Sequence, residues 1–299
     1  MSAFNRLLVA GLPLVPKFIV GKVASRYVAG ETLDDALRVV KVLNSEGAMA
    51  TIDVLGEEVA EREKALAAVD EYLRVFEAIP AHGVDSNVSI KLTLLGLKID
   101  EGFCRDNVER IAAAAKAQGN FVRIDMEDNT CTDPTLRIYH DLQPRYGNLG
   151  VVLQAYMRRT LDDIAQLPRE GASVRICKGI YVEPRRSAWK GFETVRANYV
   201  RALEKMIENG VYPAIATHDE YLVCAAQALI DKHGLHREQY EFQMLLGVDE
   251  ELRRILIAGG HRLRVYVPYG QDWYPYSIRR LRENPEVARH VLRAMLSGK

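Results

Sequence analysis

Four residues near the C-terminus combine the spacing of one helix face with the chemistry of a small anion site. They stand at i, i+3, i+4 and i+7 and are Tyr276, Arg279, Arg280 and Glu283. Such positions share one face of an α-helix. Two adjacent guanidiniums would offer a carboxylate paired N–H donors of permanent charge. The same pattern also fits a solvated, salt-bridged helix face, so its place in the fold must decide.

Polar side chains also lie at the ends of nearly all the β-branched runs of the chain. In order, they are Asp53, Lys91, Asp125, Gln154, Arg175, Lys178, Thr217, His218, Gln243, Tyr266 and Tyr269. A buried charge costs several kcal/mol unless it is paired, so a ring of such groups favours a site over core filling. For any one of them, a structural ion pair or hydrogen bond is an equally good explanation.

Several kinds of chemistry can be weighed against these residues. A metal site would need several histidines at strand ends, and His218 is the one histidine there, so no metal is expected. A serine or cysteine nucleophile lacks a Gly-x-Ser-x-Gly turn or an adjacent base. A Schiff-base aldolase that uses Lys91 or Lys178 stays open, as does a noncatalytic carboxylate-binding barrel. The cationic excess favours an anionic substrate, an anionic cofactor, or both.

The elements that would position these residues recur in a regular order. A helix is predicted over residues 33–45, with Thr32 as its N-cap. Eight β-branched runs follow, at 48–55, 87–95, 121–126, 151–156, 173–178, 212–217, 240–246 and 263–267. Helical stretches are predicted between them, for example at 57–79, 106–118, 160–167, 193–209 and 249–258.

Alternating strands and helices predict a parallel sheet, and eight such units fit a closed (β/α)8 barrel, a TIM-like α/β fold. In such barrels the site lies at the carboxyl ends of the strands. No dinucleotide or P-loop glycine motif occurs, so barrel loops would have to hold any nucleotide. We expect N-terminal helices in residues 1–46, a catalytic barrel over 47–299, and a helix after the last strand over the barrel mouth.

Composition narrows the ligand class and the compartment. The 299 residues include forty basic and forty acidic residues. Because no basic run is interleaved with aromatics, a nucleic-acid surface has little support. The cysteines lack a Cys-x-x-Cys pair and predict free thiols in a reducing, cytoplasmic compartment; they are Cys104, Cys131, Cys177 and Cys224.

The N-terminal segment, residues 6–20, is apolar but interrupted. Pro13, Pro16 and Lys17 break it well short of a length that could span a membrane, and no signal-peptide cleavage site follows. We expect one or two short helices that pack on the body, on another subunit of a homo-oligomer, or peripherally on the inner face of a membrane.

Short motifs on successive strands resemble those of the proline dehydrogenases, flavin-dependent (β/α)8 barrels found alone or within bifunctional proline-utilisation proteins. The motifs are Leu55-Gly-Glu, Ser89-Ile-Lys-Leu, Arg123-Ile-Asp-Met-Glu, Leu153-Gln-Ala-Tyr, Val174-Arg-Ile-Cys-Lys-Gly, Ala216-Thr-His, Arg264-Val-Tyr-Val-Pro-Tyr-Gly and Tyr276-Ser-Ile-Arg-Arg-Leu-Arg-Glu-Asn. With no DNA-binding or aldehyde dehydrogenase domain attached, the chain resembles the monofunctional bacterial type.

The resemblance implies oxidation of L-proline to Δ1-pyrroline-5-carboxylate, by hydride transfer to N5 of a noncovalent FAD and onward electron transfer to a membrane quinone. By the same resemblance, Asp125 and Arg175 are active-site residues. The implied substrate contacts are a carboxylate clamp of Lys91, Arg279 and Arg280 and ring walls of Leu246, Tyr266 and Tyr276.

The resemblance also implies a cofactor site and a gate. The implied FAD contacts are Met126, Gln154, Arg175, Lys178, Gly179, Ile180, Thr217, His218 and Glu283. Glu57 resembles an acid that pairs with a clamp arginine and gates the substrate. One departure is Val182, which stands where the bifunctional members have a tryptophan near the adenine.

Overall fold

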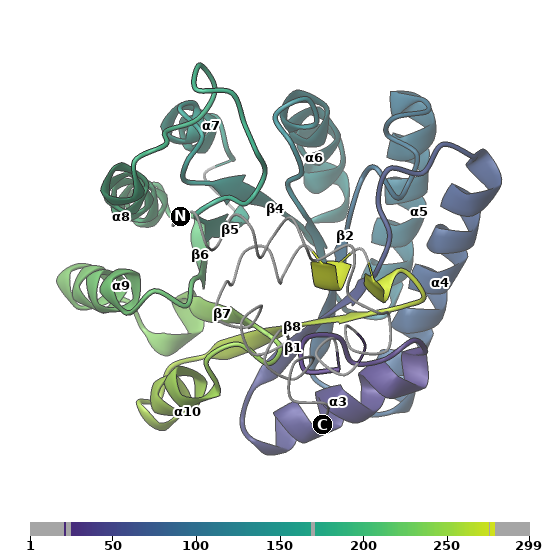
Figure 1. Ribbon diagram of the computed structural model, residues 1–299, viewed down its shortest axis with the longest axis horizontal. Coiled ribbons are helices and arrows are strands. Elements are labelled where there is room, and N and C mark those ends of the chain that lie inside the picture. Colours follow the sequence, from purple (N-terminus) through teal and green to yellow (C-terminus); the bar gives the residue numbers. More distant parts are fainter. Residues whose placement is uncertain (1–20, 22–24, 169–170, 275, 279–299) are drawn as a thin grey trace, which may run out of the picture.

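Eight parallel strands close into a barrel in the computed structural model, which describes residues 21, 25–168, 171–274 and 276–278 (Figure 1). The strands are β1 (Met49–Val54), β2 (Ser86–Ile90), β3 (Val122–Ile124), β4 (Leu149–Gln154), β5 (Ser173–Cys177), β6 (Tyr212–Ala216), β7 (Glu241–Leu245) and β8 (Leu263–Tyr269). Each strand pairs with its neighbour in the chain, and β8 closes on β1 with Thr51 opposite Tyr266. The predicted (β/α)8 barrel is confirmed.

Helices form a ring outside the barrel (Figure 1). They are α3 (Leu33–Ser45), α4 (Arg62–Ala81), α5 (Glu101–Ala117), α6 (Thr132–Tyr146), α7 (Thr160–Ala165), α8 (Phe192–Glu208), α9 (Glu220–His233) and α10 (Glu250–Ala258), with a 3-10 turn, η2 (Arg237–Gln239), before β7. Their apolar faces pack on the strands and form the main core, to which α4 contributes the buried Val69, Tyr72 and Phe76.

Helix α4 begins at Arg62, so the predicted start at residue 57 is wrong. The backbone between β1 and α4 has positive φ at Gly56 (150°) and at Glu58 (58°). A right-handed helix excludes such angles, and a glutamate adopts them rarely. The acidic residues after β1 therefore lie in a loop, and the candidate gate residue Glu57 is exposed there.

Two further boundaries differ from the prediction for local reasons. Strand β2 ends at Ile90 rather than at residue 95, because the chain then turns and the N–H of Leu95 donates to the carbonyl of Lys91. Helix α5 begins at Glu101, before the predicted 106, because the Asp100 carboxylate caps its first turn.

Polar side chains fill much of the barrel interior in two layers. Side chains alternate between the two faces of a strand, so residues two apart point the same way. The first residue of each pair lies toward the N-terminal end of the barrel and the second toward the C-terminal end. The pairs are Thr51 and Asp53, Asn87 and Ser89, Arg123 and Asp125, Ser173 and Arg175, Glu241 and Gln243, and Arg264 and Tyr266.

The segment before α3 runs along the C-terminal end of β7 and β8. Arg26 Nε donates to the Gly247 carbonyl at 2.9 Å, and the N–H of Ala29 donates to the Pro268 carbonyl at 2.9 Å. Within the described ranges, no helix is long and apolar enough to cross a membrane. Residues 1–20, the candidate bilayer contact, lie outside those ranges. The predicted division of the chain into N-terminal helices (1–46) and a catalytic barrel (47–299) stays a prediction.

The four cysteines are free thiols, as predicted. Cys104 and Cys131 are buried, Cys177 is partly buried and Cys224 is exposed.

Thr32 is expected to stabilise the helix that packs on β1 and β8. Its hydroxyl accepts from the N–H of Asp35 at 3.3 Å, and the Asp35 carboxylate accepts from the N–H of Thr32 at 3.1 Å. Thr32→Ala should lower the free energy of unfolding by about 1 kcal/mol, because a helix N–H loses its acceptor. Urea titration measures this, and Thr32→Ser should restore most of the loss. Equal stability of the alanine and serine variants would contradict the cap.

Candidate active site

The Asp125 carboxylate, just after β3, is the centre of a network that joins five strands or strand ends. Its Oδ1 accepts from Arg175 Nη1 at 2.6 Å and from Ser89 Oγ at 3.1 Å, and its Oδ2 accepts from the Tyr266 hydroxyl at 2.7 Å. Arg175 also donates through Nη2 to Ser89 at 3.1 Å and through Nε to Gln243. All three guanidinium nitrogens therefore have acceptors, which fixes the orientation of Arg175.

Lys91 contacts the same carboxylate from the end of β2. Its Nζ donates to Asp53 Oδ1 at 2.6 Å and to the Tyr266 hydroxyl at 3.0 Å, and lies 3.5 Å from Asp125 Oδ2. Lys91 is 7% exposed and Asp53 is fully buried. Two cations thus face two carboxylates, which keeps this buried cluster neutral, as low-dielectric surroundings require.

Burial and pairing together decide how these groups are charged. Burial raises the pKa of Asp125, but Arg175, Lys91 and two hydrogen bonds outweigh it, so the net pKa falls below its usual range. Burial lowers the pKa of Lys91, but Asp53 and Asp125 overcome this and raise it to about 12. Burial raises the pKa of Asp53, and Lys91 offsets this only in part. Asp125 is therefore a fixed anion near neutral pH and a poor proton acceptor.

Apolar and aromatic side chains lie at the same end of the barrel. Tyr276 is 6% exposed and belongs to a cluster with Leu55, which follows β1, and Val28. Leu246 follows β7, and its N–H donates to the carbonyl of Tyr266 at 3.1 Å. Residues 276–278 are helical. Arg279, Arg280 and Glu283 lie outside the described residues, so the carboxylate clamp of the two arginines and the FAD contact of Glu283 stay predictions.

An amide side chain and a glycine lie at the ends of β4 and β5, where the cofactor contacts are predicted. Gln154 Nε2 donates to the carbonyl of Glu127 at 2.9 Å, while its Oε1 is buried with no partner in the described part of the chain. Gly179 has φ +105°, and a Cβ there would lie 2.3 Å from the Tyr156 ring. Glycine is thus required by the close packing on Tyr156, whatever else binds nearby.

A cluster of charged side chains lies beyond these residues, at the ends of β5 and β6. Arg196 of α8 donates to both oxygens of Asp219 at 2.8 and 2.7 Å, and Lys178 Nζ donates to the same carboxylate at 3.1 Å. Both cations lie over the Phe192 ring, with Arg196 Cζ 4.2 Å and Lys178 Nζ 5.3 Å from its centroid. Arg196 Nη1 also lies 3.3 Å from Oε1 of the exposed Glu193, so two cations pair with two carboxylates, of which only Asp219 contacts both cations.

The remaining predicted contacts differ in exposure. His218 Nε2 accepts from the N–H of Leu245 at 2.9 Å, so the backbone of β7 orients this ring. Met126 and Thr217 are buried, whereas Ile180 is 37% exposed and Val182 is fully exposed.

Glu127 is a buried acid without a role in the sequence-based prediction. Its two oxygens accept from the N–H of Thr93 at 2.9 Å and from the Thr93 hydroxyl at 2.5 Å. The same hydroxyl accepts from the N–H of Glu58 at 2.9 Å, so three loops meet here. Burial raises the pKa of Glu127 to about 7, and the hydrogen bonds from Thr93 offset this only in part.

Comparison with known proteins agrees with this geometry. A family model described as proline dehydrogenase matches residues 36–293. The chain is 38% identical to the proline dehydrogenase of Deinococcus radiodurans, over 92% of this chain and 90% of that protein. It is 36% identical to proline dehydrogenase 1 of Bacillus subtilis (strain 168), over 91% of this chain and 90% of that protein. The chain belongs to the proline dehydrogenase family.

A solved structure supports the same family assignment. Proline utilization A from Bdellovibrio bacteriovorus, inactivated by N-propargylglycine, matches with a TM-score of 0.82 and 25% identity. The match covers 88% of this chain and 33% of that one, so the barrel corresponds to about a third of the longer protein. The resemblance read from the strand motifs and the predicted enzyme class are confirmed.

Within this proline dehydrogenase barrel, the structure brings Lys91, Asp125, Arg175 and Tyr266 into one network. Ser89 and Arg196 had no role in the sequence-based prediction. Ser89 stands two residues before Lys91 on one strand face, and this spacing could have identified it. Arg196 lies on a helix among many charged residues, and no sequence signal distinguishes it.

Because Glu127 is buried, its ionisation is expected to lower the free energy of unfolding as pH rises. Its pKa in the folded protein, about 7, exceeds its ordinary 4.5. The stability that depends on its proton is complete below the ordinary pKa and is lost as pH rises through about 7. Glu127→Gln mimics the protonated acid and should gain on the order of 2 kcal/mol relative to wild type between about pH 5 and about pH 8. Urea titrations at both pH values measure the gain, and a pH-independent difference would contradict the assignment.

Proposed function

We propose that this chain oxidises L-proline to Δ1-pyrroline-5-carboxylate with noncovalent FAD and passes the electrons to a quinone. Membership of the proline dehydrogenase family supports the activity. The observation that carries the site is the buried network around Asp125, in which Arg175, Lys91 and Tyr266 converge at the C-terminal end of the barrel. Active sites of this fold are built at that end.

The residues at the ends of β4, β5 and β6 suit a flavin dinucleotide. The buried Oε1 of Gln154 is an acceptor for an N–H of the flavin ring. Lys178 and Arg196, two cations that share the Asp219 carboxylate, are suitable donors to the phosphates. FAD bound there would supply the hydride acceptor at its N5. We assign to the same site Met126, Gly179, Ile180, Thr217, His218 and, at the ribose, Glu283.

Arg175 is proposed to stabilise negative charge on the electron acceptor. Asp125, Ser89 and Gln243 hold its three nitrogens, so the guanidinium is oriented before substrate binds. Preorganised charge of this kind requires little rearrangement during the reaction and acts more strongly where water is excluded. Asp125 accordingly positions Arg175 and Tyr266 rather than accepting a proton.

Lys91 is proposed to bind the proline carboxylate together with Arg279 and Arg280. Two of its three ammonium N–H groups donate to Asp53 and Tyr266. The distance to Asp125, 3.5 Å, is long for a hydrogen bond, so the third N–H is available to a substrate oxygen. Leu246, Tyr266 and Tyr276 would then enclose the ring. Glu57, exposed on the loop after β1, is proposed as the gate, and residues 1–20 as the contact with a membrane surface.

The aldolase alternative is less well supported. A Schiff-base lysine must be neutral to attack a carbonyl, and enzymes achieve this by lowering its pKa. Asp53 and Asp125 instead raise the pKa of Lys91 to about 12. Lys178 is held in an ion pair with Asp219. Both contacts favour an ammonium over a nucleophile.

The purified protein is expected to carry a flavin whose visible absorption is lost when L-proline is added without oxygen. The absorption should return on addition of a short-chain quinone, as required of an electron donor to quinone. D-Proline is the matched control and should leave the spectrum unchanged. A colourless protein that borohydride traps covalently with a keto substrate would instead establish the aldolase.

Arg280→Met should raise the KM for L-proline about tenfold or more, because a charge-assisted contact to the substrate carboxylate is lost. Steady-state kinetics with a quinone acceptor measure this. Arg237→Met is the control, since this exposed arginine of η2 precedes β7 and so lies at the end of the barrel opposite the proposed site. An unchanged KM in Arg280→Met would remove this residue from the proposed clamp.

A further inference from the structure

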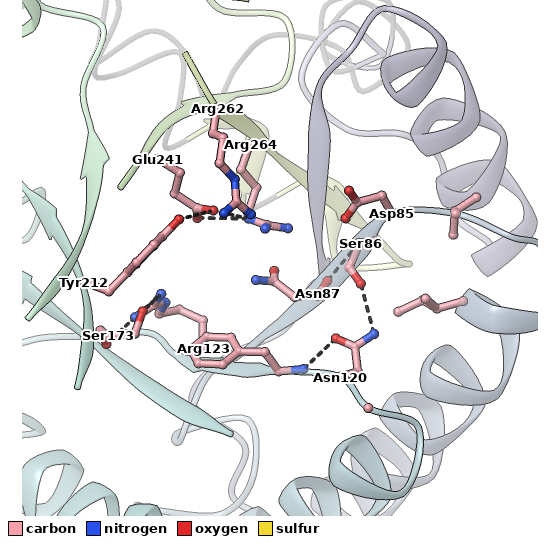
Figure 2. A pocket seen from close by; sticks show the side chains of 14 residues that line it. Asp85, Ser86, Asn87, Asn120, Arg123, Ser173, Tyr212, Glu241, Arg262 and Arg264 are labelled. Atoms are coloured by element: carbon pink, nitrogen blue, oxygen red, sulfur yellow. Dashed lines mark hydrogen bonds and ion pairs between the residues drawn. The ribbon is translucent and has the colours of Figure 1, made fainter. Parts of the chain in front are cut away.

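A polar cavity lies at the end of the barrel opposite the candidate active site, where the strands begin. Figure 2 shows the side chains that line it. Its volume is about 480 Å³, within the range of small-molecule sites. It is lined by residues at the starts of β2, β3, β5, β6, β7 and β8, none of which is assigned to the proline site. Protein interiors are closely packed, so the fold by itself does not need a cavity of this size.

Three arginines line this cavity, and within the described residues only Arg264 forms an ion pair there. Arg264 Nε lies 2.9 Å from Glu241 Oε1. Arg262 is half-buried, with only a long 3.5 Å hydrogen bond to a carbonyl and a 3.4 Å contact to a sulfur. Such contacts do not balance its charge.

Arg123 is the more unusual of the unpaired arginines. It is 2% exposed and donates to the Ser173 carbonyl at 2.6 Å, the Ser173 hydroxyl at 2.8 Å and the Val151 carbonyl at 3.2 Å. Its Nε is buried without an acceptor in the described ranges. A fully buried guanidinium is thus held by neutral oxygens alone, although buried charges ordinarily have a counter-charge.

The packing holds Arg123 at the cavity. Its Cζ lies 4.8 Å from the centroid of the Phe121 ring. A Cβ at Gly150 would lie 2.3 Å from its Nη1, so the absence of a side chain there leaves room for the guanidinium. Any larger residue at position 150 would displace it.

The charge of the lining is positive overall. Three guanidiniums face Glu241 and Asp85, which leaves an excess of one positive charge. Burial lowers the pKa of Arg123, and the nearby Arg175 and Arg264 lower it further, while Glu241 offsets this only in part, so a further anion beside Arg123 would relieve an unfavourable charge. The guanidinium remains protonated near neutral pH.

The rest of the lining sets the shape of an occupant. Asn87 and Tyr212 lie around the same central space as Arg264 and Arg123 (Figure 2) and add hydrogen-bonding groups. Ile79, Val84 and Phe121 form an apolar part of the wall. A single charged group attached to a small apolar body would match both parts.

We propose that this cavity binds a small organic anion with one carboxylate or phosphate group, held by Arg123 and Arg262 and separate from the proline site. The cavity and the site share a hydrogen-bond network, because Glu241 accepts from both Arg264 and Gln243 and Gln243 accepts from Arg175. Substitution of Glu241 or Arg264 would therefore disturb both regions. Arg262 lies outside this network and provides a clean test.

Calorimetric titration of the purified protein with its cofactor tests the proposal, at constant ionic strength, without oxygen, and both with and without saturating L-proline. Phenyl phosphate and benzoate are the probes and distinguish the two charged groups, and benzyl alcohol is the neutral control. At least one anion should bind saturably at one equivalent, and the alcohol should not. Arg262→Gln should weaken that binding about tenfold, the usual loss for a hydrogen bond to a charged group. Arg237→Gln, an exposed arginine of η2 outside the cavity, should leave it unchanged.

Three results would overturn the proposal. The first is that neither anion binds saturably. The second is that L-proline displaces the bound anion, and the third is that Arg262→Gln binds the anion as tightly as wild type does. The first would leave the arginines a purely structural role, and the second would place the anion in the proline site. The third would place it elsewhere on the surface.

Discussion

The pairing of charges inside a closed barrel is the constraint on which the site depends. Asp125 accepts hydrogen bonds from Arg175 and Tyr266, and Lys91 lies between it and Asp53. Each charge is held out of water at a cost of several kcal/mol that only its partners offset. Every member is therefore oriented by the others before any ligand arrives. Preorganisation of this kind is what a site for a charged reaction requires.

The loops around the mouth are tied to the same strands by short polar contacts. Thr93 donates to Glu127 through its N–H and hydroxyl and accepts from the N–H of Glu58, so hydrogen bonds link the loops after β1, β2 and β3. The segment at Arg26 is attached in turn to the turn after β7. The bond from the Glu58 N–H to Thr93 thus anchors the loop residue next to Glu57.

The two ends of the barrel differ in how their charges are balanced. At the C-terminal end, cations and carboxylates of the inner network match, and outside it Lys178 and Arg196 pair with Asp219, with Glu193 as a second partner of Arg196. At the N-terminal end, Arg123 is buried against neutral oxygens. The first arrangement suits a reaction centre flanked by an anionic cofactor, and the second suits the reversible binding of an anion. Gln243 and Glu241 connect the two.

The sequence by itself determined the architecture and the strand-end residues, because alternating strand and helix patterns depend on local periodicity and favour one closed topology. It placed Lys91 and Asp125 at strand ends, directly after β2 and β3, whereas Arg175 lies within β5. It missed the starts of α4 and α5, because backbone angles and caps set these over a few residues. Only the tertiary structure decided which charges meet. The partners Lys91 and Tyr266 are 175 residues apart in the chain, and barrel closure, which no local pattern encodes, brings them together.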